Sequence, residues 1–246
     1  MFDHVTIRVA DRAASEGFYS TVLATLGVER TSSGEMGAEW SDFSLSPASA
    51  SKPAARGLHL GFVAPSRAAV DAFWHAGIDA GFADAGAPGL RPQYREDYYG
   101  AFLLDPDGNS AEAVHHAGVD VDHGDEGEVD HVWIRVRDLA AARAFYAHVA
   151  PHGGFGLATD TPERVSFRGG GRSFSLVAEG PPTEHLHLAF GAPDQATVAA
   201  FHAALIGAGY EDNGPPGERP EYHPGYYGAF VYDPDGNNVE VVFHDR

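Results

Sequence analysis

The chain has 246 residues, no cysteine and a formal net charge of −19, from 35 acidic residues against 16 lysines and arginines. This acidic balance repels phosphate backbones and anionic lipid, so we expect neither nucleic acid nor a membrane as a partner. Without cysteine, any metal must be held by His, Asp or Glu. No apolar run has the length of a membrane span and no signal-peptide pattern opens the chain, so we expect a cytoplasmic protein.

The first predicted elements follow from the spacing of apolar residues. The alternating run HVTIRV, from His4, predicts a strand. Asp11 is the predicted N-cap of a helix whose apolar residues recur every four positions from Ala14, and Gly27 is its predicted stop. Strand-like segments follow, such as EWSDFSLS from Glu39. This order predicts a strand, a helix and then further strands.

The same order then begins again. The run LHLGFV, from Leu58, predicts a strand, and a helix is predicted to start at Ser66 or Asp71 and to end near Gly77. The turn motif DPDGN precedes a closing strand, AEAVHH, because Pro and Gly favour turns. Two βαβββ modules in succession predict the α+β fold class.

The whole arrangement occurs twice. DHVTIRV from Asp3 returns as DHVWIRV from Asp130, and YYGAFLLDPDGNSAE from Tyr98 returns as YYGAFVYDPDGNNVE from Tyr226, at nearly the same spacing. The segment between the copies is acidic and Gly-rich, which is typical of a linker. The predicted organisation is an N-terminal domain, an acidic linker and a C-terminal domain: 1–117, 118–128 and 129–246.

Two histidines and one glutamate recur in each half, all in predicted strands. Two imidazoles and one carboxylate on one sheet face match the facial triad that leaves positions on a metal open for substrate, oxygen or water. A lone histidine in a strand is usually structural, but the retention of the set in both halves favours a metal site. The six candidate metal ligands are His4, His59, Glu112, His131, His187 and Glu240.

The motifs DHVTIRV, LHLGF and DPDGNSAE, with their second copies, resemble those of the vicinal oxygen chelate superfamily. That group includes glyoxalase I, fosfomycin- and bleomycin-resistance proteins, methylmalonyl-CoA epimerase and extradiol dioxygenases. The resemblance implies two tandem glyoxalase-like domains, each of two βαβββ modules that form a curved, partly closed mixed sheet. It also implies a divalent ion (Fe, Mn, Zn, Ni or Co). Modules in this superfamily pair within a domain or exchange between domains, so a mixed site of His4, His187 and Glu240 stays open.

Individual members of the superfamily differ in the residues around the metal. Glyoxalase I adds a carboxylate ligand where this chain is expected to have Ser44 or Ser175, which leaves a three-ligand site. Extradiol dioxygenases add a histidine and a tyrosine; His223 matches the former, as a candidate acid or base, but Phe230 stands in the place of the latter. The C-terminal half is therefore the better dioxygenase candidate.

Repeated tyrosines and arginines flank the closing glutamates. The tyrosines either wall a pocket and orient an oxygenated ligand or pack the sheet edge, and one of each adjacent pair should face inward. The arginines either bind an anion or cap a backbone carbonyl. The candidate catalytic residues are His223, Tyr227 and Tyr99. The candidate substrate-binding residues are Arg91, Tyr94, Tyr98, Arg219, Tyr222 and Tyr226.

The expected function is that of a divalent-metal-dependent enzyme acting on a small, vicinally oxygenated substrate, as a dioxygenase or a glyoxalase-like lyase or isomerase. One alternative is a non-enzymatic protein that binds a small molecule of the antibiotic type, as bleomycin-resistance proteins do. Another is a regulatory or carrier protein that uses the same pocket. The ligand set is retained twice, which favours the enzyme. A monomer or homodimer is expected.

Overall fold

A computed structural model describes residues 1–35, 37–116 and 128–245. The expected linker, 118–128, lies outside the described residues except for Glu128. The described part contains four βαβββ modules. The first is β1 (Phe2–Val9), α1 (Arg12–Ala24), β2 (Ser32–Gly34), β3 (Gly37–Trp40) and β4 (Phe43–Pro47). The second is β5 (Leu58–Val63), α2 (Arg67–Asp79), β6 (Ala83–Leu90), β7 (Tyr98–Leu104) and β8 (Ser110–His116).

The second half repeats this order. The third module is β9 (Val129–Arg135), α3 (Leu139–Gly153), β10 (Gly156–Asp160), β11 (Arg164–Gly169) and β12 (Arg172–Val177). The fourth is β13 (His187–Gly191), α4 (Gln195–Gly207), β14 (Asp212–Glu218), β15 (Tyr226–Tyr232) and β16 (Asn238–His244). The α+β prediction is confirmed.

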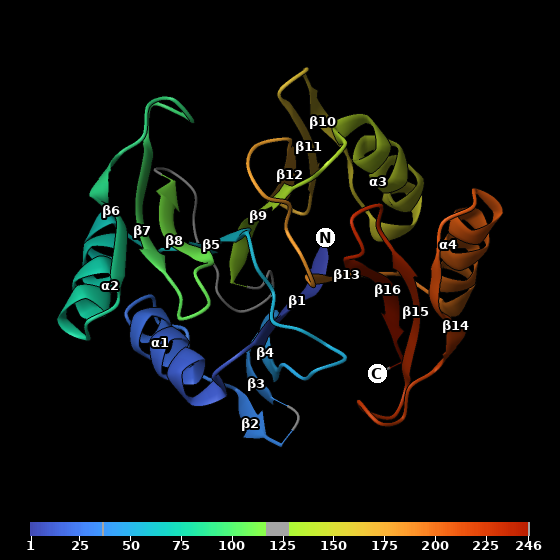
Figure 1. The fold of residues 1–246 in the computed structure, drawn as a ribbon, viewed down its shortest axis with the longest axis horizontal. Coiled ribbons are helices and arrows are strands. Elements are labelled where there is room, and N and C mark those ends of the chain that lie inside the picture. The colour runs from blue at the N-terminus through green and yellow to red at the C-terminus, as the bar shows by residue number, and fades with distance from the viewer. Residues whose placement is uncertain (36, 117–127, 246) are drawn as a thin grey trace. The chain divides into compact units, whose positions relative to one another are not determined.

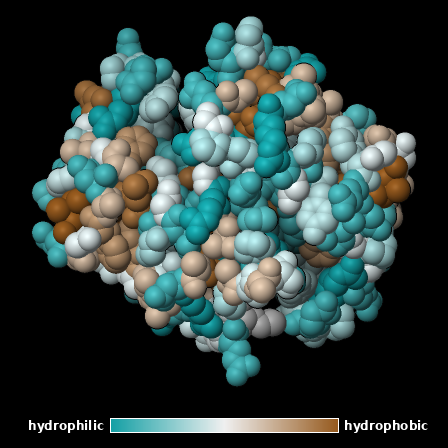
Figure 2. All heavy atoms as spheres, viewed as in Figure 1, coloured by the Kyte–Doolittle hydropathy of each residue, from teal (hydrophilic) through white to brown (hydrophobic). Residues whose placement is uncertain are grey.

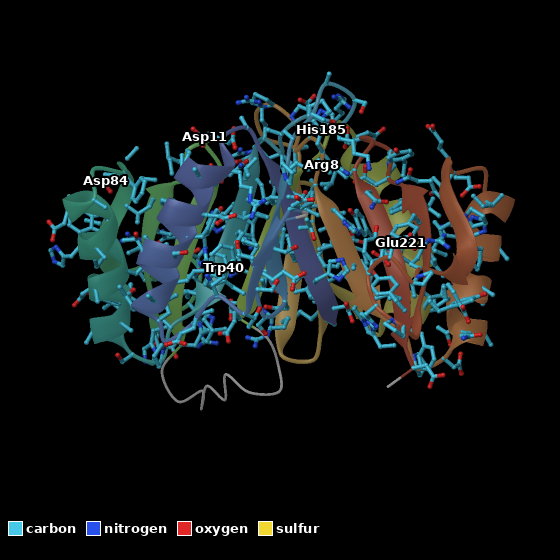
Figure 3. All side chains as sticks on the ribbon, turned by 90° about the horizontal axis from the view of Figure 1, so that it is seen from below. Arg8, Asp11, Trp40, Asp84, His185 and Glu221 are labelled. Carbon is cyan, nitrogen blue, oxygen red and sulfur yellow. The ribbon has the colours of Figure 1, made fainter. Side chains whose placement is uncertain are left out.

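Side-chain capping sets the starts of the helices. Asp11 caps α1 as predicted, because its carboxylate accepts the N–H of Ala14, and it lies at the end where the helix begins (Figure 3). For α2 the cap is Ser66, not Asp71. This helix continues past Gly77 to Asp79. A Cβ at Gly77 would overlap the side chain of Leu103, so this glycine allows α2 to pack closely on β7.

The strands form two eight-stranded mixed sheets. Their orders are β14-β15-β16-β13-β1-β4-β3-β2 and β10-β11-β12-β9-β5-β8-β7-β6. Within them β13 runs parallel to β16, and β5 runs parallel to β8. The first strand of the chain is thus the neighbour of β13, and β9 is the neighbour of β5. Each of these contacts joins a module of one half to a module of the other.

The chain divides into two compact units. We call Thr6–Val132 the N-terminal unit, and Met1–Val5 with Trp133–Arg246 the C-terminal unit. The division falls inside β1 and inside β9. The expected domains, 1–117 and 129–246, follow the sequence repeat and remain a proposal.

Each unit has its own apolar core beneath its helices. Figure 1 shows α2 (teal) along β6, β7 and β8, and α4 (orange) along β14, β15 and β16. In the N-terminal unit the fully buried rings are Phe18, Tyr19, Trp40, Phe43, Phe62 and Phe73. In the C-terminal unit they are Phe145, Tyr146, Phe167, Phe174, Phe190 and Phe201. The helices therefore cover one face of the strands and leave the other face for polar side chains.

Hydrophobic surface is limited on the face shown in Figure 2, where brown groups are small and separated by hydrophilic residues. Among the described residues, no helix has both the length and the apolar character needed to cross a membrane. Of the residues that the structure describes, five large hydrophobic side chains are exposed: Leu90, Tyr94, Leu157, Ile206 and Tyr222. Two of them, Tyr94 and Tyr222, occupy the same position in the two repeats.

Candidate metal centres

One cluster of potential metal ligands lies in the N-terminal unit. It joins His59 of β5, Glu112 of β8 and His131 of β9, which we call the N-terminal triad. Oε2 of Glu112 lies 3.0 Å from Nε2 of His59 and 3.2 Å from Nε2 of His131, and the two Nε2 atoms are 3.1 Å apart. Glu112 is buried, while the side chain of His59 is 18% exposed. Three donor atoms therefore converge on the side where His59 meets solvent.

The carboxylate of this triad is held by β7. The hydroxyl of Tyr98 donates a 2.7 Å hydrogen bond to Oε1 of Glu112, which leaves Oε2 for the histidines. Gly100 lies beneath the same carboxylate, and a Cβ there would overlap Oε1. The repeated YYG motif is thus explained: the tyrosine orients the glutamate and the glycine makes room for it.

Both imidazoles are oriented through their second nitrogen. Nδ1 of His59 lies 2.9 Å from Oγ of Ser110, and Nδ1 of His131 lies 2.8 Å from Oδ2 of Asp130. The carboxylate of Asp130 is also 3.3 Å from Nε2 of His116. A hydrogen bond at Nδ1 fixes the ring so that Nε2 points at the shared centre, as it does in metal-binding histidines.

Electrostatic coupling inside the triad is strong. Burial raises the pKa of Glu112, but hydrogen bonds from His131 and His59 outweigh burial and lower this pKa from 4.5 to about 2. Burial lowers the pKa of His131, but its bonds to Asp130 and Glu112 outweigh burial and raise this pKa from 6.5 to about 10. For the same reason the pKa of Asp130 is lowered, by bonds from His116 and His131 against the effect of burial. Without a cation, protonated His131 and ionised Glu112 therefore form an ion pair, and the proton on His131 supplies the positive charge that a metal would supply.

A second cluster lies in the C-terminal unit. It joins His4 of β1, His187 of β13 and Glu240 of β16, which we call the C-terminal triad. Nε2 of His187 lies 2.9 Å from Oε2 of Glu240, whereas Nε2 of His4 lies 3.6 Å from the same oxygen. The two imidazoles meet edge to face with their centroids 5.0 Å apart. The glutamate is again buried, and its Oε1 accepts a 2.5 Å hydrogen bond from Tyr226.

A chain of hydrogen bonds leads from His4 to the edge of the C-terminal unit. Oδ1 of Asp3 lies 2.9 Å from Nδ1 of His4, and Oδ2 lies 2.9 Å from Nε2 of His244. Nδ1 of His244 is in turn 2.9 Å from Nε2 of His223. Burial raises the pKa of Asp3, but bonds from His244 and His4 outweigh it and lower this pKa. His223, a predicted acid or base, is therefore linked to the C-terminal triad through two side chains and does not touch it.

The DPDGN turn joins the strands that carry the ligands. Oδ1 of Asp105 accepts two backbone N–H groups of the turn, including that of Asn109, and Oδ2 accepts the buried hydroxyl of Tyr19. Oδ1 of Asn109 accepts the N–H of Leu58, where β5 begins. This turn therefore positions β5 beside β8, which places His59 near the glutamate. The second copy repeats these contacts with Asp233, Asn237, Tyr146 and Leu186.

The N-terminal triad fits a divalent ion. In an octahedral site with bonds of about 2.1 Å, neighbouring ligand atoms are about 3.0 Å apart. The three separations of 3.0, 3.1 and 3.2 Å correspond to one face of that octahedron. Two nitrogens and one carboxylate oxygen also suit Fe, Mn, Zn, Ni and Co.

The family model of the Glyoxalase/Bleomycin resistance protein/Dioxygenase superfamily matches residues 1–113 and 128–241. The chain belongs to this superfamily. Glyoxalase I from Zea mays is 19% identical, with a TM-score of 0.68 over 98% of this chain and 92% of that chain. A putative dioxygenase from Bacillus subtilis is 14% identical, with a TM-score of 0.65 over 100% of this chain and 85% of that chain.

A glyoxalase/bleomycin resistance protein from Albidiferax ferrireducens is 34% identical over 47% of this chain and 99% of that chain, with a TM-score of 0.44. No curated protein matches the chain. The superfamily fold of two tandem glyoxalase-like domains, expected from the repeated motifs, is confirmed.

The structure brings together all six predicted ligands of this superfamily member, in the exchanged combination. His131 joins two residues of the first half, and His4 joins two residues of the second half. The combination of His4, His187 and Glu240 was one of the two arrangements that the sequence left open. Its cause is the strand order, because β1 neighbours β13 and β9 neighbours β5.

The adjacent tyrosines alternate as expected. Tyr98 and Tyr226 face the triads, whereas the hydroxyl of Tyr99 donates to Asp71 of α2, on the opposite face of β7. Tyr227 follows Tyr226 in β15 and turns to the corresponding face. The hydroxyl of Tyr99 is thus directed away from the N-terminal triad, and the predicted catalytic roles of Tyr99 and Tyr227 remain proposals.

The outer tyrosines lie beside the inner ones. Tyr94 and Tyr222 are about half exposed, and their rings lie 5.1 Å from Tyr98 and 4.8 Å from Tyr226. These are the exposed members of the repeated set, and a substrate-binding role for them remains a proposal.

Both candidate arginines cap backbone carbonyls, which was the structural alternative. Arg91 donates to the carbonyl of Ala87, and Arg219 donates to the carbonyl of Pro215. Each guanidinium also lies over a phenylalanine ring, 5.3 Å from Phe102 for Arg91 and 5.5 Å from Phe230 for Arg219. Anion binding by these arginines remains a proposal.

The predicted fourth-ligand positions hold serines that bond elsewhere or are buried. Oγ of Ser44 lies 2.7 Å from Oγ1 of Thr6, and Ser175 is buried in β12. Within the described residues each candidate group has three members, and the expected three-ligand site remains a proposal.

Two residues that orient the histidines were not predicted from the sequence. Asp3 and Asp130 each hold the histidine that follows them. The signal was present in the repeated Asp-His pair, in which a carboxylate comes directly before a candidate ligand in both halves. Strand alternation turns neighbouring residues to opposite faces, so periodicity alone does not predict a bond between these adjacent side chains.

Proposed function

We propose that this member of the superfamily is a divalent-metal-dependent enzyme that acts on a small substrate with vicinal oxygen atoms. The observation that carries the proposal is the N-terminal triad, whose three donor atoms are about equally spaced around one point. Three ligands leave about three positions of an octahedral ion open, enough for a bidentate substrate and for oxygen or water. The second triad, of the same residue types, supports a second ion.

The residues of the chain have distinct roles in this proposal. His59, Glu112 and His131 would hold the ion, which supplies Lewis acidity toward the substrate oxygens. Asp130 keeps the Nδ1 proton of His131 and so directs Nε2 to the ion. Tyr98 occupies the outer oxygen of Glu112, so the carboxylate offers a single oxygen to the centre. Ligand orientation is thus fixed before the ion arrives, which lowers the cost of assembling the site.

Two reaction classes are open to such a site. The fold is shared with glyoxalase I from one source and with a putative dioxygenase from another, so the fold does not choose between them. An extradiol reaction needs an acid or base near the bound oxygens, and the hydrogen-bonded path from His223 to the C-terminal triad runs through His244 and Asp3. We therefore expect a lyase or isomerase unless catechol cleavage is measured.

Metal content is the first test. Protein purified without added metal is analysed by elemental analysis, then stripped with a chelator and titrated with Mn(II), whose free form gives an electron paramagnetic resonance signal. We expect up to two ions per chain, with Glu112→Ala and Glu240→Ala each removing about one. A protein that holds no metal and takes up none on titration would shift the function to metal-free binding of a small molecule.

Turnover is the second test. The stripped protein is loaded anaerobically with Fe(II) and given catechols and oxygen, or loaded with Zn(II), Ni(II), Co(II) or Mn(II) and given vicinally oxygenated carbonyl compounds. Ring cleavage that is lost in both Glu112→Ala and Glu240→Ala, or in one of them, supports the dioxygenase. Turnover of the carbonyl compounds alone supports the lyase or isomerase.

A further inference from the structure

The two triads have the same residue types but different geometry. In the N-terminal triad both histidines lie within 3.2 Å of the shared oxygen, and their rings stack at an interplanar angle of 28°. In the C-terminal triad Nε2 of His4 lies 3.6 Å from Oε2 of Glu240. The ring of His4 is nearly perpendicular to that of His187, at an interplanar angle of 85°. The side chain of His4 is also more exposed than that of His131, at 22% against 7%.

One sequence difference between the repeats lies directly under the histidine that differs. The run that contains His59 reads LHLGF, and the run that contains His187 reads LHLAF, so Gly61 corresponds to Ala189. These residues hold equivalent places, since Gly61 pairs with Glu112 in the parallel register and Ala189 pairs with Glu240.

The glycine is required for the position of His131. A Cβ on Gly61 would overlap Cε1, Nδ1 and Nε2 of the His131 imidazole, so the ring lies directly over the bare backbone. The backbone of Gly61 is not left-handed, and the three atoms nearest to a Cβ at this position all belong to the imidazole of His131. Ala189 carries that methyl group and is fully buried. The corresponding place is therefore closed to the ring of His4.

We infer that the residue at positions 61 and 189 makes the two metal sites inequivalent, with Gly61 creating a preorganised, high-affinity site in the N-terminal unit and Ala189 a weaker, more open one in the C-terminal unit. The inference rests on the proposed metal binding and adds which site fills first and why. The N-terminal donors need little movement to coordinate a cation. In the C-terminal triad His4 must approach first, and the work of moving it reduces the affinity.

The test uses single-site proteins, in which Glu240→Ala leaves the N-terminal site and Glu112→Ala leaves the C-terminal site. Each stripped variant is titrated with Mn(II), and binding is followed by calorimetry and by the loss of the free-ion resonance signal. We expect the N-terminal site to bind about 10- to 100-fold more tightly, the range found when residues that orient ligands are altered.

Reciprocal substitutions then test the cause. Gly61→Ala in the Glu240→Ala background should weaken the N-terminal site by about tenfold or more, and Ala189→Gly in the Glu112→Ala background should strengthen the C-terminal site. Circular dichroism in chelator checks that Gly61→Ala folds. If it does not fold, Ala189→Gly decides the outcome, since it removes only a methyl group.

The outcomes separate the inference from the proposed function. No Mn(II) uptake by the wild type overturns the proposed function itself. Two sites of equal affinity leave the proposed function intact and overturn the inference. Unequal sites that do not respond to either reciprocal substitution overturn the role of positions 61 and 189.

Discussion

At the scale of single residues, the N-terminal triad is an ion pair whenever no cation occupies it. The pKa of His131 is raised to about 10 and that of Glu112 is lowered to about 2. The histidine contributes stability fully below its unfolded value of 6.5, and this contribution is lost as the pH rises through about 10. The glutamate contributes above 4.5, and its contribution is lost as the pH falls through about 2. The pair therefore stabilises the metal-free fold most between pH 4.5 and pH 6.5.

We predict that in chelator the thermal midpoint of the wild type falls between pH 6.5 and pH 10 more steeply than that of His131→Asn. Each unit of pKa shift corresponds to about 1.4 kcal/mol, so the difference should be measurable. Equal slopes for the wild type and His131→Asn would show that the coupling is absent.

The hydroxyl of Tyr98 should matter to metal binding, and that of its neighbour should not. We predict that Tyr98→Phe weakens Mn(II) binding at the N-terminal triad by about tenfold, because Glu112 loses the bond that orients it. Tyr99→Phe removes a hydroxyl that bonds to Asp71 on the other face, so it should leave the affinity unchanged. Calorimetric titration in the Glu240→Ala background measures both. Equal effects of the two substitutions would contradict the assigned role of Tyr98.

At the scale of elements, the DPDGN turn before β8 is hydrogen-bonded to Tyr19 of α1 and to Leu58 of β5. We predict that Asp105→Ala lowers the free energy of unfolding by about 2–4 kcal/mol, because it leaves the buried hydroxyl of Tyr19 and two turn N–H groups without their acceptor. Asp107→Ala is the control in the same turn. It removes one exposed contact to the N–H of Ala10, and should cost about 1 kcal/mol or less.

Urea unfolding of both variants in chelator checks this prediction. The metal-free state is needed, because bound metal would add its own stabilisation. A loss for Asp107→Ala as large as that for Asp105→Ala would mean that the turn is held by its backbone and not by the buried carboxylate.

The elements themselves were largely predictable from the sequence. The cap at Asp11 and the module order follow from spacing, which is a local signal, and the six candidate ligands follow from the repetition of motifs between the two halves. The choice of Ser66 over Asp71 was not decided, because both are good N-caps and only packing selects between them. The length of α2 beyond Gly77 was not predictable either, since this glycine serves a close contact with Leu103 and does not end the helix.

At the scale of the whole molecule, the exchange of first strands between the two halves could not be predicted from the sequence. Each module presents a first strand of the same pattern, so periodicity does not tell which first strand becomes its neighbour. The grouping of His4 with Glu240 depends on β1 lying beside β13, which is a property of the complete chain. The sequence therefore predicts two histidines and one glutamate at each site, but not which half of the chain supplies each histidine.

We predict that deleting residues 1–5 removes the C-terminal metal site and keeps the N-terminal one. The deletion takes away His4, while the N-terminal unit, Thr6–Val132, retains its triad. Mn(II) titration should therefore find about one ion per chain, and full-length His4→Ala should give the same result. Two ions in the truncated protein would rule out the exchanged arrangement.

The order in which the chain is synthesised gives the exchange a further consequence. Phe2–Val5 are synthesised well before their partner strand β13, which begins only at His187. At elongation rates of about 5–20 residues per second, Phe2–Val5 wait roughly 10–40 s for that partner. Closing the C-terminal unit is thus a late event with a large sequence separation, which slows folding. Until β13 has been synthesised, β1 lacks this neighbouring strand, so the edge of β1 needs protection during translation.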